Sequence, residues 1–110
     1  MILTYYEGGS LRLQSGSLSI LLDPQSNRLK ADVILRTLTP TNLFENGNEI
    51  SSASDISFPG EYEVSGVLVS GIASRSRDPE GHRNTVYVFE MDDLRLCHLG
   101  EMNKVPKADL

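Results

Sequence analysis

The chain has 110 residues, a formal net charge of −5 and one cysteine. This length fits one domain, residues 1–110, and the lone Cys97 excludes an internal disulfide framework. The chain begins without a basic segment or a long apolar run, so neither a signal peptide nor a transmembrane helix is predicted, and a cytoplasmic location is expected. The negative charge opposes binding to nucleic acid and to anionic membranes, and neither is an expected partner.

Most of the chain shows the apolar patterns of β-strands. About eight strands are predicted, in chain order, at Ile2–Tyr6, Leu11–Gln14, Ser17–Leu22, Val33–Leu35, Glu61–Val64, Val67–Ile72, Val86–Met91 and Leu94–Leu99. Pairs of residues that suit tight turns predict three hairpin tips, at Ser15-Gly16, Ser65-Gly66 and Asp92-Asp93. The sequence therefore predicts a mainly β protein whose antiparallel or mixed sheets are built from hairpins.

The expected core consists of apolar strand residues. They are Leu13, Ile20, Leu22, Ile34, Val67, Val69, Val86, Val88 and Leu96. The run Val67-Leu68-Val69 is apolar at every position, which indicates a strand covered on both faces. Because no amphipathic helix is predicted to cover an open sheet, a two-fold homodimer packing sheet to sheet is expected. Alternatively, the hairpins of one chain close into a small sandwich of their own.

The segment after the strand at Val33–Leu35 is the first place to look for a site. Pro40 lacks an N–H and disfavours a regular strand or helix, so the stretch from Thr37 is predicted to be a loop at the strand's C-terminal end. Its side chains include the hydroxyls of Thr37, Thr39 and Thr41 and the amide of Asn42. These groups form a candidate anion-binding loop, although Thr-rich loops more often serve only as turns.

Four stretches, in this order, resemble the metallo-β-lactamase fold. They are Ser17–Pro24 (SLSILLDP), Ala31–Thr37 (ADVILRT), Ser57–Ile72 with its Pro-Gly-Glu-Tyr-Glu core, and Leu94–Glu101 with His-Leu-Gly-Glu. Within that family the chain is similar to the cytoplasmic branch of the L-ascorbate-6-phosphate lactonases. The resemblance implies the N-terminal half of an αββα fold with a metal site at the sheet edge, so a C-terminal half is also an expected partner.

The metal-ligand motif of this family is degenerate in the chain. Family members continue from the Thr into His-x-His-x-Asp-His, and the residues at the four ligand positions here are Leu38, Pro40, Asn42 and Leu43. Leu and Pro have no donor atom, and an amide is a poor ligand for zinc. Where the family has a bridging Asp after Gly, the chain has Glu101, which remains a weak candidate ligand. No metal or other cofactor is therefore expected.

The remaining candidates each have a structural explanation. His98 lies in an apolar strand and is a weak candidate ligand, although a core or edge histidine with a hydrogen-bond partner is the commoner case. Glu61 and Glu63 share a strand face at period two, as paired catalytic carboxylates do, but a solvated face explains them as well. No catalytic residue is assigned.

Two functions follow. The preferred one is a metal-free, non-catalytic domain that acts as a binding or assembly module. The alternative is a metal-dependent hydrolase of the metallo-β-lactamase superfamily whose ligands come from a missing C-terminal half or from a partner chain.

Overall fold

The computed structural model describes residues 1–6, 9–24, 29–40, 55–75 and 81–100, and every regular element among them is a strand. Five strands form the first sheet, sheet A, in the order β1-β2-β3-β4-β6. Their bounds are Ile2–Tyr5 (β1), Leu11–Ser15 (β2), Leu18–Leu22 (β3), Val33–Leu35 (β4) and Asp55–Ile56 (β6). The strand β3 pairs parallel with β4 and β4 pairs parallel with β6, whereas β1, β2 and β3 are antiparallel.

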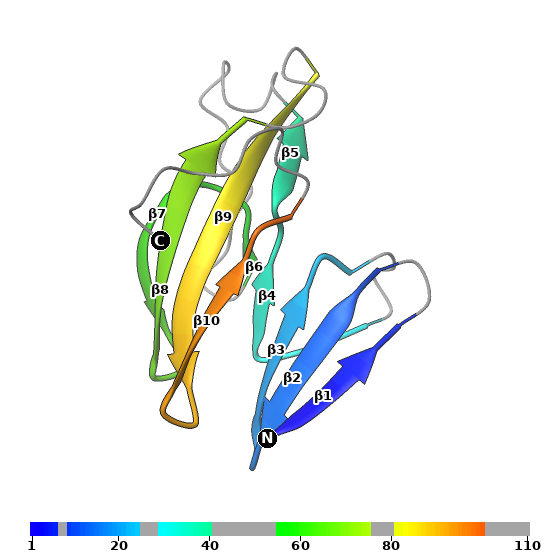
Figure 1. The fold of residues 1–110 in the computed structure, drawn as a ribbon. Helices are drawn as coiled ribbons and strands as arrows, with labels where there is room; N and C mark the ends of the chain where they lie inside the picture. Colours follow the sequence, from blue (N-terminus) through cyan, green and yellow to red (C-terminus); the bar gives the residue numbers. More distant parts are fainter. Residues whose placement is uncertain (7–8, 25–28, 41–54, 76–80, 101–110) are drawn as a thin grey trace.

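The second sheet, sheet B, has the order β10-β9-β8-β7 with β5 paired to β9, and all of its pairs are antiparallel. Its bounds are Leu38–Pro40 (β5), Gly60–Val64 (β7), Val67–Ser74 (β8), His82–Met91 (β9) and Leu94–His98 (β10). The two sheets and the segment from β4 to β5 that joins them are visible in Figure 1. The predicted fold class, mainly β with antiparallel and mixed sheets built from hairpins, is confirmed.

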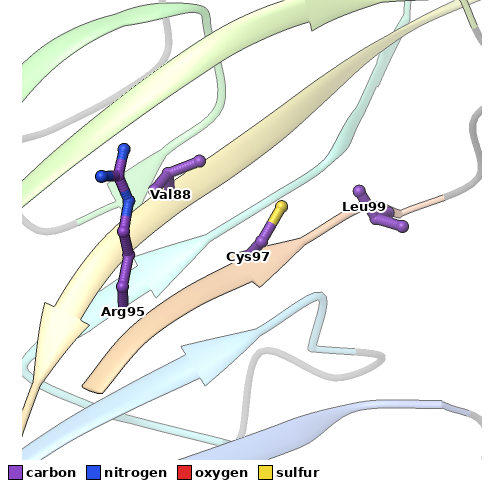
Figure 2. Close-up of a pocket in the computed structure, with 4 residues that line it drawn as sticks. All are labelled: Val88, Arg95, Cys97 and Leu99. Atoms are coloured by element: carbon purple, nitrogen blue, oxygen red, sulfur yellow. The ribbon is translucent and has the colours of Figure 1, made fainter. Parts of the chain in front are cut away.

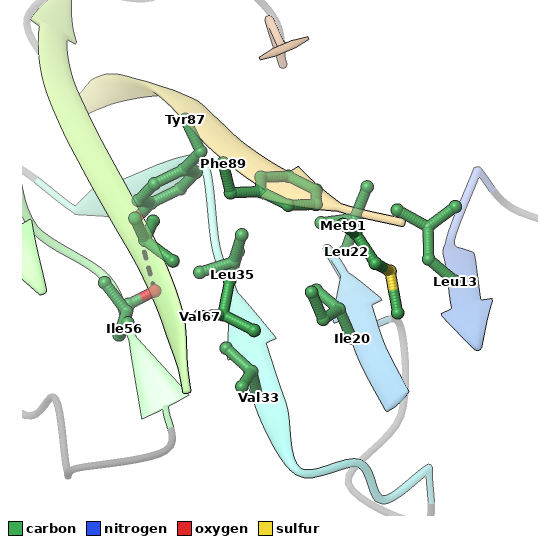
Figure 3. Close-up of a cluster of buried hydrophobic side chains, with 11 residues drawn as sticks. Leu13, Ile20, Leu22, Val33, Leu35, Ile56, Val67, Tyr87, Phe89 and Met91 are labelled. Carbon is green, nitrogen blue, oxygen red and sulfur yellow. Dashed lines mark hydrogen bonds between the residues drawn. The ribbon is translucent and has the colours of Figure 1, made fainter. Parts of the chain in front are cut away.

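The inner faces of the two sheets pack against each other (Figure 3). Sheet A contributes Leu13, Ile20, Leu22, Val33, Leu35 and Ile56, and sheet B contributes Val67, Val69, Tyr87, Phe89 and Met91. Burial of this apolar surface is the main force holding the sheets together. The chain thus closes a sandwich of its own, which removes the uncovered inner face on which the expectation of sheet-to-sheet dimerisation rested.

Two polar interactions tie this core to the short parallel strands. The Tyr87 hydroxyl donates to the carbonyl of Arg36 at 2.7 Å and to that of Ile56 at 3.2 Å, so a side chain of β9 reaches the ends of β4 and β6. Arg36 forms an ion pair with Asp55, whose Oδ1 lies 2.9 Å from Nε. Three-residue and two-residue strands have few ladder hydrogen bonds, and these contacts supplement them.

Two details of the predicted strands and turns need correction. The segment Leu38–Pro40 is strand β5 and not a loop, because β9 extends far enough to pair with it and Pro40 stands at the end of the pairing. The first hairpin tip is Gly16-Ser17, one residue later than predicted, since Ser15 already pairs with Leu18.

Burial also differs at three residues. Leu68 is 69% exposed, because the outer face of β8 has no covering layer among the described residues. Ile34 and Leu96 are only half-buried, whereas the other seven predicted core residues are buried. The hairpin tips Ser65-Gly66 and Asp92-Asp93 are confirmed, and all four residues have the positive φ that such turns require.

Candidate functional site

Asp23 lies where the parallel strands β3 and β4 end side by side. It follows β3 directly and has a φ of 48°, a left-handed conformation that turns the chain out of the sheet. Its N–H donates to the carbonyl of Leu35 at 2.9 Å, and its carbonyl accepts from the Ser10 hydroxyl at 2.8 Å. These backbone contacts fix the position of the Asp23 carboxylate beside the end of β4.

The Asp23 carboxylate joins the two sheets. Its Oδ1 accepts from the backbone N–H of Thr37 at 2.7 Å, and its Oδ2 accepts from the Thr37 hydroxyl at 2.7 Å. His98, the last residue of β10, places Nε2 2.8 Å from the same Oδ2. Burial raises the pKa of Asp23, but the hydrogen bonds from His98 and Thr37 outweigh burial and leave the pKa below its ordinary value. The carboxylate is therefore held in its charged form.

Thr37 is also the point at which the chain passes from sheet A to sheet B. Its carbonyl accepts from the N–H of Thr85 on β9 at 2.7 Å. The neighbouring Asn84 donates from Nδ2 to the Ser74 hydroxyl at 2.7 Å and to the Leu99 carbonyl at 3.0 Å. One backbone hydrogen bond and two from the Asn84 side chain thus connect the chain after β4 with β8, β9 and the end of β10.

Gly100 closes this cluster because a larger residue would not fit. Its φ is 65°, and a Cβ atom there would lie 2.5 Å from Cβ of Thr37 and 2.7 Å from Oδ1 of Asn84. Both features require glycine. We refer to Asp23, Thr37, Asn84, His98 and Gly100 as the strand-end cluster.

The strand-end cluster includes one residue of the predicted anion-binding loop. Thr37 and Thr39 are both 2% exposed, and the Thr39 hydroxyl donates to the Ser57 carbonyl at 2.6 Å. Their hydroxyl protons are thus used inside the protein. Thr41 and Asn42 lie outside the described residues, as does Glu101. The described part of the predicted loop provides no hydroxyl donor to an external anion.

The other predicted candidates lie away from the strand-end cluster. Glu61 and Glu63 are both exposed on the edge strand β7, and Glu61 accepts from the Ser70 hydroxyl at 2.7 Å. His82, the other histidine of the sequence, was not a predicted candidate and begins β9 beside Pro40. Sequence reasoning identified His98 but missed Asp23 as its partner. The available signal was the Asp-Pro pair at the end of β3, since parallel strands bring their carboxyl ends to one edge of a sheet.

The residues present do not fit the metal site that the resemblance implies. Two of the four ligand positions fall in β5, where Leu38 and Pro40 have no donor atoms. Within the described ranges, no group of three or more His, Cys, Asp or Glu side chains could hold a metal ion. In the strand-end cluster, the two atoms that could bind a metal, Nε2 of His98 and Oδ2 of Asp23, contact each other.

A separate hollow of about 400 Å³ lies on the outer face of sheet B (Figure 2). Arg95, Cys97 and Leu99 line it from β10 and its continuation, and Val88 lines it from β9. Burial raises the pKa of the Cys97 thiol, which disfavours the nucleophilic thiolate. None of the described residues that line this hollow is a base that could activate the thiol.

A family model of the beta-lactamase superfamily domain matches residues 2–109. The chain belongs to the beta-lactamase superfamily. A comparison of the chain with curated proteins finds no match. The residues described here include no helix that is long and apolar enough to cross a membrane.

A solved structure from Thermotoga maritima has the same fold as this beta-lactamase superfamily domain. That protein belongs to the metallo-beta-lactamase superfamily and was proposed to be a Zn-dependent hydrolase. The TM-score is 0.59 at 23% sequence identity, and the match covers 89% of this chain and 48% of the other. This domain thus spans about half the length of the solved protein, in agreement with the half-fold that the resemblance implied.

Proposed function

We propose that this domain is a metal-free, non-catalytic member of the beta-lactamase superfamily that acts as a binding or assembly module. The observation that carries the proposal is the internal pairing of the strand-end cluster. Both oxygens of Asp23 accept hydrogen bonds from Thr37, and the Nε2 atom of His98 faces Oδ2. The cluster therefore acts as a structural joint between the sheets, at the edge where relatives with the full ligand motif would bind metal.

Recruiting these residues as ligands would disrupt the joint. A zinc ion taking Nε2 of His98 would replace the contact with Asp23, and one taking Oδ2 would also displace the Thr37 hydroxyl. A stable zinc site needs three or four donors, and this pair supplies two. Leu38 and Pro40 cannot supply the others. A cytoplasmic location is part of the proposal, since the free Cys97 thiol suits a reducing compartment.

Metal analysis tests the proposal. The protein is purified without chelator, incubated with excess zinc or manganese, passed through a desalting column and analysed for metal content. We expect well under about 0.2 ion per chain, because two donors do not retain a divalent ion. His98→Gln should not alter this value, and neither should His82→Gln, which removes the other histidine and serves as the matched control.

Stoichiometric metal would overturn the proposal. One ion per chain that is lost in His98→Gln or Glu101→Ala, but kept in His82→Gln, would favour the metal-dependent hydrolase. Such an ion would require donors beyond the described residues, such as Glu101, a C-terminal half or a partner chain. Hydrolysis of a lactone or phosphodiester by the metal-loaded protein would then be the next measurement.

A further inference from the structure

The outer face of sheet B is buried in one part and open in another. Val86 and Val88 of β9 face outwards, because Tyr87 and Phe89 alternate with them and point into the core. Val86 is 0% exposed and Val88 is 8% exposed, whereas Leu68 on the same face of β8 is 69% exposed. Leu68 lies near the hairpin tips and Val86 lies level with the end of β10. Burial on this face therefore increases toward the end where β10 leaves the sheet.

The neighbours of Val86 within the sheet do not account for its burial. Val86 pairs with Ile72 of β8, and the register of β9 and β10, continued by one residue, brings Leu99 level with it on the other side. Ile72 and Leu99 are themselves 38% and 42% exposed. All described strands belong to the two sheets, and sheet A packs on the inner face, so no described strand lies above Val86. Its burial indicates a covering segment outside the described residues.

The chain leaves β10 beside this buried area. Leu99 lines the hollow on the outer face together with Val88 (Figure 2). Gly100 follows with a φ of 65°, which turns the chain away from the direction of β10. A Cβ atom on Gly100 would lie 2.7 Å from Oδ1 of Asn84 on β9, and the Asn84 side chain donates to the Leu99 carbonyl. Residues 101–110 therefore begin at the margin of the area that needs a cover.

We propose that residues 101–110, the C-terminal segment, cross the outer face of sheet B and place apolar side chains over Val86 and Val88. The segment contains Met102, Val105 and Leu110. Ten extended residues reach about 33 Å and three neighbouring strands span only about 10 Å, so the segment is long enough to cross β9 and β8. Burial of apolar surface on both sides supplies the driving force. The part of the face around Leu68 stays open.

Two other segments outside the described residues fit this role less well. Residues 76–80, which connect β8 to β9, read Ser-Arg-Asp-Pro-Glu and carry three charges. Residues 41–54 connect β5 of sheet B to β6 of sheet A, so their two ends are held by different sheets. The C-terminal segment alone of the three begins beside Leu99.

The first test measures nuclear Overhauser contacts in the full, isotopically labelled chain. We expect contacts between the methyl groups of Val86 or Val88 and those of the C-terminal segment, with Val105 among them. The absence of any contact between the C-terminal segment and both valines would overturn the proposal. Contacts of the same valines with residues 41–54 in place of the C-terminal segment would overturn it as well.

The second test compares two substitutions that add the same charge to the C-terminal segment. Val105→Asp should raise the equilibrium constant of unfolding about tenfold, because the buried surface of one valine is lost. Asn103→Asp is the matched control, since a polar side chain is replaced there, and it should change the constant less than about twofold. Equal constants for both variants would overturn the proposal. Metal content depends on neither substitution, so the metal-free function stands or falls separately.

Discussion

Asp23→Asn tests the strand-end cluster with the smallest change in shape. The amide keeps one oxygen that can accept from the Thr37 N–H but loses the negative charge. The variant also loses the second carboxylate oxygen. In the parent chain this oxygen accepts from the Thr37 hydroxyl and faces His98. A hydrogen bond to a charged group contributes about 1.5–3 kcal/mol. Two of the three contacts are lost or weakened, so we expect the free energy of unfolding to fall by about 2–4 kcal/mol at neutral pH.

The effect of Asp23→Asn should depend on pH in a defined direction. The pKa of Asp23 in the folded chain lies below its ordinary value of 3.8. A group with a lowered pKa contributes its full stability above the unfolded value, and this contribution is lost as the pH falls through the folded value. The difference in unfolding free energy between the parent chain and Asp23→Asn should therefore shrink below about pH 4.

Urea unfolding monitored by circular dichroism and tyrosine fluorescence measures this difference, since the chain has four tyrosines and no tryptophan. Asp32→Asn is the matched control. Asp32 accepts from the Ser19 N–H at 2.8 Å but is exposed and stays within sheet A, so its loss should cost less than about 1 kcal/mol. Equal stability of Asp23→Asn and the parent chain at neutral pH would refute the role of the carboxylate as a joint.

Two further substitutions test the packing. Gly100→Ala should lower the free energy of unfolding by about 2–4 kcal/mol, because the new Cβ would overlap Thr37. Gly16 has a similar φ but open space around it, so Gly16→Ala should cost only about 1 kcal/mol. Chemical denaturation measures both values. Val69→Ala should cost about 2–4 kcal/mol and Leu68→Ala less than about 0.5 kcal/mol, as judged by the same unfolding curves; equal costs would mean that the register of β8 is wrong.

The sequence predicted the local features of the fold well. Two hairpin tips were predicted correctly because the residue types at a tight turn are those that tolerate a positive φ, as at Asp92-Asp93. The first tip was misplaced by one residue, since Ser15-Gly16 and Gly16-Ser17 are similar turn pairs and the choice depends on which cross-strand register buries Leu13 opposite Ile20. Alternating patterns identify a strand more reliably than they set its register.

Non-local features were predicted less well. The strand at Leu38–Pro40 was missed because its partner residues, His82–Asn84, lie more than forty positions away, and nothing within the segment signals that pairing. The strand Val67-Leu68-Val69 was expected to be covered on both faces, but Leu68 is exposed, because an apolar run does not reveal whether a second layer covers the sheet. Asp23 and His98 are 75 positions apart, so the contact between them follows only from the assembled sheets.

The Tyr87 hydroxyl bears on the order in which the chain folds. The strand β6 has two residues and, among the described strands, pairs with β4 alone. The carbonyls at the ends of both strands nevertheless accept from a side chain of β9. Closing the chain between positions 36 and 87 costs entropy before that hydrogen bond can form. The hairpins of β2–β3 and β9–β10 should accordingly form early, and the parallel part of sheet A should become stable only when sheet B docks on it. Mutations that slow this docking would prolong an intermediate in which the edges of both sheets are open.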